Sequence, residues 1–94
     1  MKEFIFSCNM DGLRVQFDRH EISKCDLIGD ISIKENGTQK QATVNVRCKS
    51  IHQYMNALLG VIVGDIVIFC GLVNKIERID AENNIFKITG EFNS

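Results

Sequence analysis

Proline and tryptophan are both absent from this 94-residue sequence, which also contains only one tyrosine. Without proline the chain has no polyproline segment or stiff linker, and its seven glycines are scattered. Few flat side chains remain for stacking on a ligand, because Tyr54 and six phenylalanines are the only aromatic residues. Length and mixed composition predict one globular domain that spans residues 1–94.

A secretion signal and closely spaced cysteine pairs are also lacking. The opening residues MKEFIFSCNM contain neither the long apolar segment nor the small-residue cleavage site of a signal peptide. The four cysteines are far apart in the sequence, and three of them lie inside apolar runs. We therefore expect a cytoplasmic chain with reduced thiols, since nothing else in the sequence indicates an oxidising compartment.

The longest apolar segment runs from Ala57 to Val73 and is interrupted only by Asp65 and three glycines. A membrane span needs roughly 20 mostly apolar residues, and an aspartate near its centre is costly. A single helix is disfavoured as well, because β-branched residues dominate the segment and the glycines break it. We expect the end of a helix, a turn at Gly64-Asp65 and a long strand, with no membrane partner.

Alternation of apolar and polar residues predicts most of the strands. Leu13–Phe17 and Gln41–Lys49 alternate strictly, and Asn36-Gly37 is typical of a hairpin turn before the second of them. A bulge or bend is expected at Gly71, and the first two strands should form a hairpin or one long bent strand. The predicted strands are 2–8, 13–17, 26–34, 41–49, 66–79 and 85–92.

One short helix is expected between the third and fourth main strands. Ser50 can cap it, Gly60 can end it, and a 3.6-residue period connects Ile51, Tyr54, Met55, Leu58 and Leu59. Five or six strands with one short helix in fewer than a hundred residues predict a mainly β fold. The expected form is a small closed or partly open barrel.

This order of elements resembles the oligonucleotide/oligosaccharide-binding (OB) barrel. The residues that carry the resemblance are the hairpin ISIKENGTQKQATVNVRC, the helix SIHQYMNALLG and the Gly-Asp-x-Val-x-x-x-Gly strand GDIVIFCGLVNKIE. Bacterial single-stranded DNA-binding proteins are similar across Val44–Val73. The resemblance implies an OB-like barrel that binds single-stranded nucleic acid on an exposed strand face.

The charge distribution is compatible with such a face. The net charge is only −1, so bulk attraction to nucleic acid is not expected, but no acidic residue lies between Asn36 and Gly64. Cations, an amide and an aromatic ring on exposed strand faces could bind phosphates and bases. The candidate nucleic-acid-binding residues are Arg14, Lys34, Asn45, Arg47, Lys49 and Phe69. The open alternative is that these strand faces are only solvated.

A second resemblance predicts a protein partner instead. The C-terminal segment GDIVIFCGLVNKIERIDAENNIFKITGE is also similar to small β-barrel modules of bacteriophage tail hubs and head–tail connectors, which bind protein. A small protein inhibitor is a third reading. A homo-oligomer is expected because small barrels leave strand edges that self-association can cover.

No catalytic or metal-binding motif is recognisable, so we expect a non-enzymatic protein without a cofactor. The pairs Cys48/His52 and His20/Cys25 are spaced too loosely for a zinc site. The same residues lack the orienting group that a Cys–His catalytic pair needs. Asp65 suits a turn better than a reactive carboxylate.

Overall fold

The computed structural model describes residues 1–50 and 54–93, and almost all of its regular structure is β-strand. The short 3₁₀ turn η1 (Lys24–Asp26) precedes the fourth strand. The strands are β1 (Lys2–Ser7), β2 (Leu13–Phe17), β3 (His20–Glu21), β4 (Leu27–Asn36), β5 (Gln39–Arg47), β6 (Leu58–Val63), β7 (Ile66–Asp80) and β8 (Ile85–Asn93). The predicted mainly β class is confirmed.

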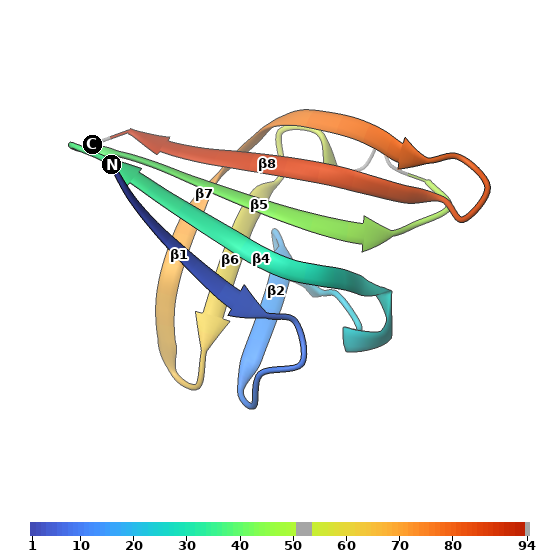
Figure 1. Cartoon of the computed structure of the whole chain (residues 1–94), viewed down its shortest axis with the longest axis horizontal. Coiled ribbons are helices and arrows are strands. Elements are labelled where there is room, and N and C mark those ends of the chain that lie inside the picture. The colour runs from blue at the N-terminus through green and yellow to red at the C-terminus, as the bar shows by residue number, and fades with distance from the viewer. Residues whose placement is uncertain (51–53, 94) are drawn as a thin grey trace.

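All eight strands belong to one open antiparallel sheet with the order β1-β4-β5-β8-β7-β6-β2-β3 (Figure 1). The structure does not support the predicted small barrel, closed or partly open, of five or six strands: it has one open sheet of eight strands that curls over one core. Among the described residues, no helix is long and apolar enough to cross a membrane.

The β4–β5 hairpin has the turn that the sequence predicts. Asn36 faces Gln39 across the ladder, so Gly37 and Thr38 form a two-residue loop. Gly37 has a φ of 65°, the positive value that the first central residue of a type II′ hairpin turn requires. The alternation on β5 also holds, because Ala42, Val44 and Val46 are buried.

The predicted hairpin between the first two strands is wrong. β1 pairs with β4, whereas β2 pairs with β6 at the other end of the sheet. The turn between them is held by a hydrogen bond from Gly64 N to Gly12 O at 2.9 Å, which joins it to the β6–β7 turn. Two strands that are consecutive in the chain thus lie near opposite borders of the sheet, and the sheet must curl to accommodate both.

The structure does not support the predicted helix: among its described residues only Tyr54 is helical, in 3₁₀ conformation. Leu58, Leu59 and Gly60 belong to β6, and Asn56 has a φ of 65°, which an α-helix cannot include. Residues 51–53, the start of the predicted helix, lie outside the described residues. The error arose because an apolar pair at 58–59 fits a helical period and a strand equally well, and sheet pairing with β7 decided between them.

Strand β7 belongs to two ladders and turns the sheet through a corner. Its first half pairs with β6 as far as Leu72, and its second half pairs with β8 from Leu72 onward. Register shifts on both sides of the change mark bulges, which sharpen the local twist. Figure 1 shows the result: β7 curves from alongside β8 to run down beside β6.

The corner divides the sheet into two parts, one with β1, β4, β5 and β8 and the other with β6, β2 and β3. The inner sides of both parts pack on a common core. The largest fully buried side chains come from strands on both parts: Leu13, Val15, Phe17, Ile31, Val44, Val46, Leu59, Val61, Val73 and Ile88. At the corner itself the backbones approach too closely for any side chain. A Cβ on Gly71 would lie 2.5 Å from Glu91 O and 2.8 Å from Phe69 Cζ.

We expect Gly71→Ala to destabilise the fold by about 1–3 kcal/mol, because the new methyl group meets backbone that must move. The matched control is Gly60→Ala on neighbouring β6, where an added Cβ has no heavy atom within 4 Å. Its effect should stay within about 0.5 kcal/mol. Urea unfolding with comparable m-values measures both. Equal stability of the two variants would contradict the role assigned to Gly71.

Candidate functional site

The structure distributes the six predicted nucleic-acid-binding residues over several places. Lys34, Asn45 and Arg47 lie on the outward side of β4 and β5, opposite the buried positions of those strands. Arg14 lies on β2 in the other part of the sheet, where its Nη2 donates to Gly64 O at 3.4 Å. Phe69 is only 3% exposed and packs in the core, so it presents no ring to a base.

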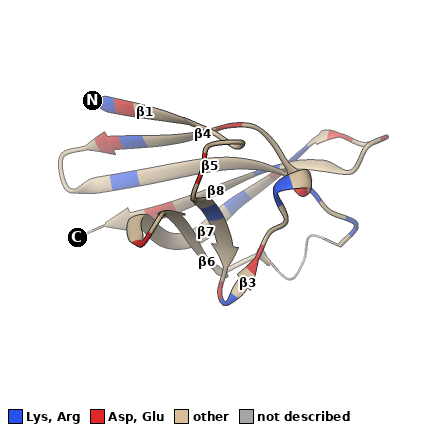
Figure 2. Cartoon of the chain, turned by 90° about the horizontal axis from the view of Figure 1, so that it is seen from below, with Lys and Arg blue, Asp and Glu red and all other residues tan. Residues whose placement is uncertain are grey.

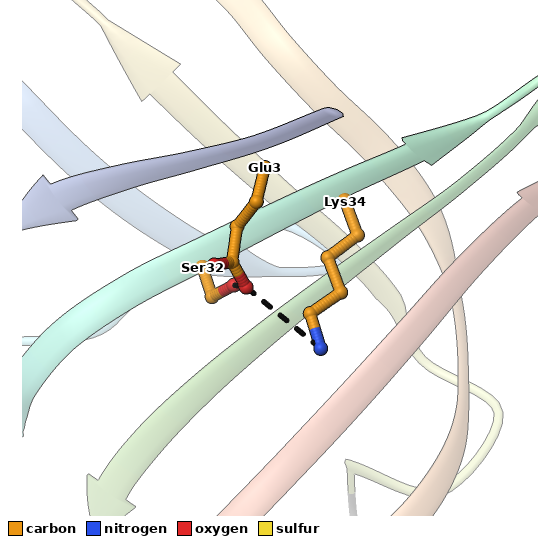
Figure 3. Close-up of polar contacts among 3 residues, drawn as sticks. All are labelled: Glu3, Ser32 and Lys34. Atoms are coloured by element: carbon orange, nitrogen blue, oxygen red, sulfur yellow. Dashed lines mark hydrogen bonds and ion pairs between the residues drawn. The ribbon is translucent and has the colours of Figure 1, made fainter. Parts of the chain in front are cut away.

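The charge of Lys34 is partly neutralised by a residue from another strand. Its Nζ lies 3.8 Å from Glu3 Oε2, and the same carboxylate oxygen accepts a hydrogen bond from Ser32 Oγ at 3.1 Å (Figure 3). A solvent-exposed pair of this kind adds little stability. It does remove Lys34 as an isolated cation on the sheet surface.

The acid-free stretch of sequence is not an acid-free surface. Lys40 Nζ lies 3.6 Å from Glu35 Oε1 on β4, and Gln41 Nε2 donates to Glu91 Oε1 on β8 at 3.1 Å. Figure 2 shows basic and acidic residues interspersed along the strands. Sheet pairing thus brings the acids of distant segments beside the basic ones.

Two of the predicted cations remain together at the end of β5. Arg47 Nη1 donates to Cys25 O at 3.5 Å, and Arg47 and Lys49 border a hollow of about 480 Å³. The lining residues, named here the Arg47 hollow, are Asp26, Arg47, Cys48, Lys49, Ser50, Tyr54, Asn83 and Asn84. Two cations and two amides can bind an oxyanion, although Asp26 lowers the local positive charge.

A second hollow lies on the outward side of the strands β4, β5, β8 and β7. It has a volume of about 470 Å³ and is lined by Lys34, Gln41, Thr43, Asn74, Lys75, Glu77, Lys87, Thr89 and Glu91. Its charges alternate in sign, and Lys75 Nζ lies 3.4 Å from Glu77 Oε1. On the same side, Asn45 Oδ1 is buried with no hydrogen-bond partner among the described residues, a situation that costs about 1–3 kcal/mol.

The outward side of β6 and of the first half of β7 is apolar rather than charged. Three facing pairs follow one another along this ladder: Leu58–Leu72, Gly60–Cys70 and Ile62–Val67. We call these six residues the apolar face. None of them carries a charge, and Leu58, Leu72 and Val67 remain 41%, 56% and 59% exposed.

A small depression lies in the middle of the apolar face. Gly60 contributes no side chain, and the hollow beside it has a volume of about 110 Å³; the other residues that line it are Gln16, Asp18, Leu58, Ile62, Val67 and Cys70. Small-molecule sites usually measure about 300–1,000 Å³. This hollow is therefore of a size to take one side chain of another molecule rather than a whole ligand.

Sequence reasoning did not identify the apolar face. The signal that could have found it is the run from Leu58 to Leu72, in which residues on both sides of the strands are largely apolar. Because this sheet has a core on one side only, the apolar residues on the other side must remain exposed.

The carboxylate of Asp80 stabilises the turn between β7 and β8. Asp80 Oδ1 accepts a hydrogen bond from Asn83 N at 3.1 Å, and Asp80 Oδ2 accepts one from Asn83 Nδ2 at 2.8 Å. These hydrogen bonds, led by the one from the Asn83 side chain, lower the pKa of the exposed Asp80 carboxyl because they favour its charged form.

Metal-ligating side chains do not converge in the part of the chain that the structure describes: no group of three or more His, Cys, Asp or Glu residues could hold an ion there. Of the two Cys–His pairs considered from the sequence, the pair with Cys48 includes His52, which lies outside the described residues. All four thiols are free.

Comparison of the chain with protein-family models, with curated proteins and with solved structures finds no match. The site must therefore be interpreted from its own geometry.

In an NMR pH titration, Asp80 should ionise below its ordinary pKa, and Asn83→Ala should raise that pKa towards the ordinary value. A carboxyl whose pKa is lowered on folding stabilises the fold above its unfolded pKa, and this contribution is lost as the pH falls through its folded pKa. The stability difference between wild type and Asp80→Asn should accordingly shrink on acidification. An Asp80 pKa that does not respond to Asn83→Ala would contradict the assigned cause.

Proposed function

We propose that the chain is a non-enzymatic module that binds another protein through the apolar face. The observation that carries the proposal is the exposure of three successive uncharged pairs on one ladder of the sheet. Contiguous exposed apolar surface of this kind is typical of protein–protein contact sites, because a partner removes it from water.

The shape of the face favours a protein partner over a small molecule. The hollow beside Gly60 fits a single side chain, and the leucines and valine around it are positioned to exclude water from such a contact. The partner that this surface suits presents an apolar side chain to the hollow and an apolar area around it. Arg14, opposite Ile62 on the neighbouring strand, can contact polar groups on the rim of the partner, and Asp18, which lines the hollow, accepts a hydrogen bond from Leu58 N at 2.9 Å.

The polar groups elsewhere support a binding role rather than a reactive one. The carboxylates of Glu3, Glu35 and Glu77 are engaged with lysines, and that of Asp80 holds a turn. The resemblance to small barrel modules of bacteriophage tails implies the same class of partner and belongs to this proposal, as does the reading of the chain as a small protein inhibitor.

Binding of single-stranded nucleic acid is the second candidate, and the Arg47 hollow is the observation that favours it. Arg47 and Lys49 offer charge to phosphates, and Asn84 offers a side-chain amide beside them, while Asn83 Nδ2 already donates to Asp80 Oδ2. The OB-like interpretation belongs to this candidate. It ranks second because Lys34 is paired, Arg14 lies on the other part of the sheet and Phe69 is buried.

A random-peptide display selection on the immobilised chain tests the first candidate. Peptides selected on wild type should carry apolar residues and should bind Leu72→Asp and Gly60→Val at least about tenfold more weakly. The first variant places a charge on the apolar face, and the second fills its hollow. Circular dichroism should confirm that both remain folded.

The matched control for that selection is Thr43→Asp, which adds the same charge on the outward side of β5 and should leave peptide affinity unchanged. The proposal fails if no enriched peptide discriminates between wild type and Leu72→Asp, or if Thr43→Asp weakens binding as much.

Fluorescence anisotropy with a labelled single-stranded oligo-dT tests the second candidate. Binding should weaken with salt, and Arg47→Ala/Lys49→Ala should reduce the slope of log K against log salt by about 1.4, since each single-strand phosphate contact contributes about 0.7. Lys75→Ala, which removes a paired lysine, serves as the control and should change the slope less. Absence of binding at low salt would exclude this candidate.

A further inference from the structure

Strand β1 leaves one border of the sheet open. It is the first strand of the sheet order and, among the described residues, it pairs only with β4 (Figure 1). The backbone N–H and C=O groups on its other side therefore have no strand to bond with, which makes this border a template for one further strand.

The opposite border of the sheet, formed by β3, is less suited to pairing with another strand. β3 consists only of His20 and Glu21, both polar and exposed, and Ile22 N continues the bonding to Val15 O at 2.8 Å. Short, charged edge strands resist pairing with other chains, whereas β1 has six residues without proline, glycine or a bulge. At its centre Phe4 and Ile5 remain 44% and 56% exposed.

The one carboxylate on β1 does not protect its free border. Glu3 Oε2 is turned back across β4, where it accepts from Ser32 Oγ at 3.1 Å and pairs with Lys34 Nζ at 3.8 Å (Figure 3). An approaching strand thus meets no free negative charge there. Lys2, at the beginning of the strand, is the only other charged residue of β1.

The sequence of β1 is complementary to itself in one antiparallel register. With Ile5 opposite Ile5 of a second copy, Phe4 lies opposite Phe6 and Glu3 lies opposite Ser7. This register keeps the two phenylalanines on the core side, because they pair with the buried Ile33 and Ile31 on β4.

The polar positions do not oppose this register. Glu3 lies opposite the neutral Ser7 of the second copy, while its carboxylate stays bound to Ser32 and Lys34 of its own chain. No like charges face one another, and aromatic pairs of this type stabilise neighbouring strands.

We propose that β1 is a homodimer interface, in which two copies of this chain pair their β1 strands antiparallel about a two-fold axis at Ile5. Such a contact is isologous, so it closes as a dimer and joins the two sheets into one. The interface uses none of the residues of the apolar face and does not depend on the proposed function.

Light scattering and sedimentation equilibrium of the untagged chain over a concentration series test the pairing. Wild type should approach the mass of two chains. Ile5→Lys should raise the dimer dissociation constant at least about tenfold, because it replaces two apolar side chains at the axis with facing like charges. Leu72→Lys, an equally exposed position on the apolar face, should leave the dissociation constant unchanged.

Cysteine cross-linking tests the register. In a background with the exposed Cys25 and Cys70 changed to serine, Ile5→Cys should form an intermolecular disulfide under mild oxidation. Ser7→Cys should not, because in this register Ser7 faces Glu3 rather than its own copy. A monomeric wild type, a dimer insensitive to Ile5→Lys, or a dimer dissociated by Leu72→Lys instead would each overturn the proposal.

Discussion

The close approach of β7 to β8 at Gly71 is the constraint on which the shape of this sheet depends. A backbone oxygen of Glu91 occupies the space where a side chain would begin, so the two strands can cross only with glycine there. Because β7 changes partners at Leu72, the parts of the sheet on either side of it face one another across a single core. The core between these parts includes the buried residues of β2 at the far end of the strand order.

The same crossing determines which side chains face outward on the two parts of the sheet. Strands β4, β5 and β8 place their alternating polar residues outside, where lysines and glutamates of neighbouring strands form pairs. Strand β6 and the first half of β7 are apolar at both sets of positions, and a curled sheet offers them only one core. The remaining apolar side chains of Leu58, Val67 and Leu72 are therefore exposed, and the proposed protein-binding surface rests on this surplus.

Electrostatics illustrates how sheet pairing changes the meaning of a sequence pattern. The segment without acids between Asn36 and Gly64 predicts a basic surface, but antiparallel pairing sets β5 between the acidic residues of β4 and β8. Arg47 at the end of β5 and Lys49 just after it share one hollow, and Asp26 lies with them there. Charge in a sheet is a property of neighbouring strands rather than of one segment.

The sequence by itself determined the strands whose evidence is local: strict alternation on β2 and β5, the Gly37 turn, and the length of β7. Alternation and turn geometry act between residues that are close in the chain, so they can be read without the fold. The tertiary structure decided whether Leu58-Leu59 belongs to a helix or a strand, that β1 and β2 pair with different partners, and that Phe69 faces the core. It also decided which apolar residues of β6 and β7 remain outside. Those outcomes depend on contacts between segments far apart in the chain, and the free energy of such contacts outweighs local preference.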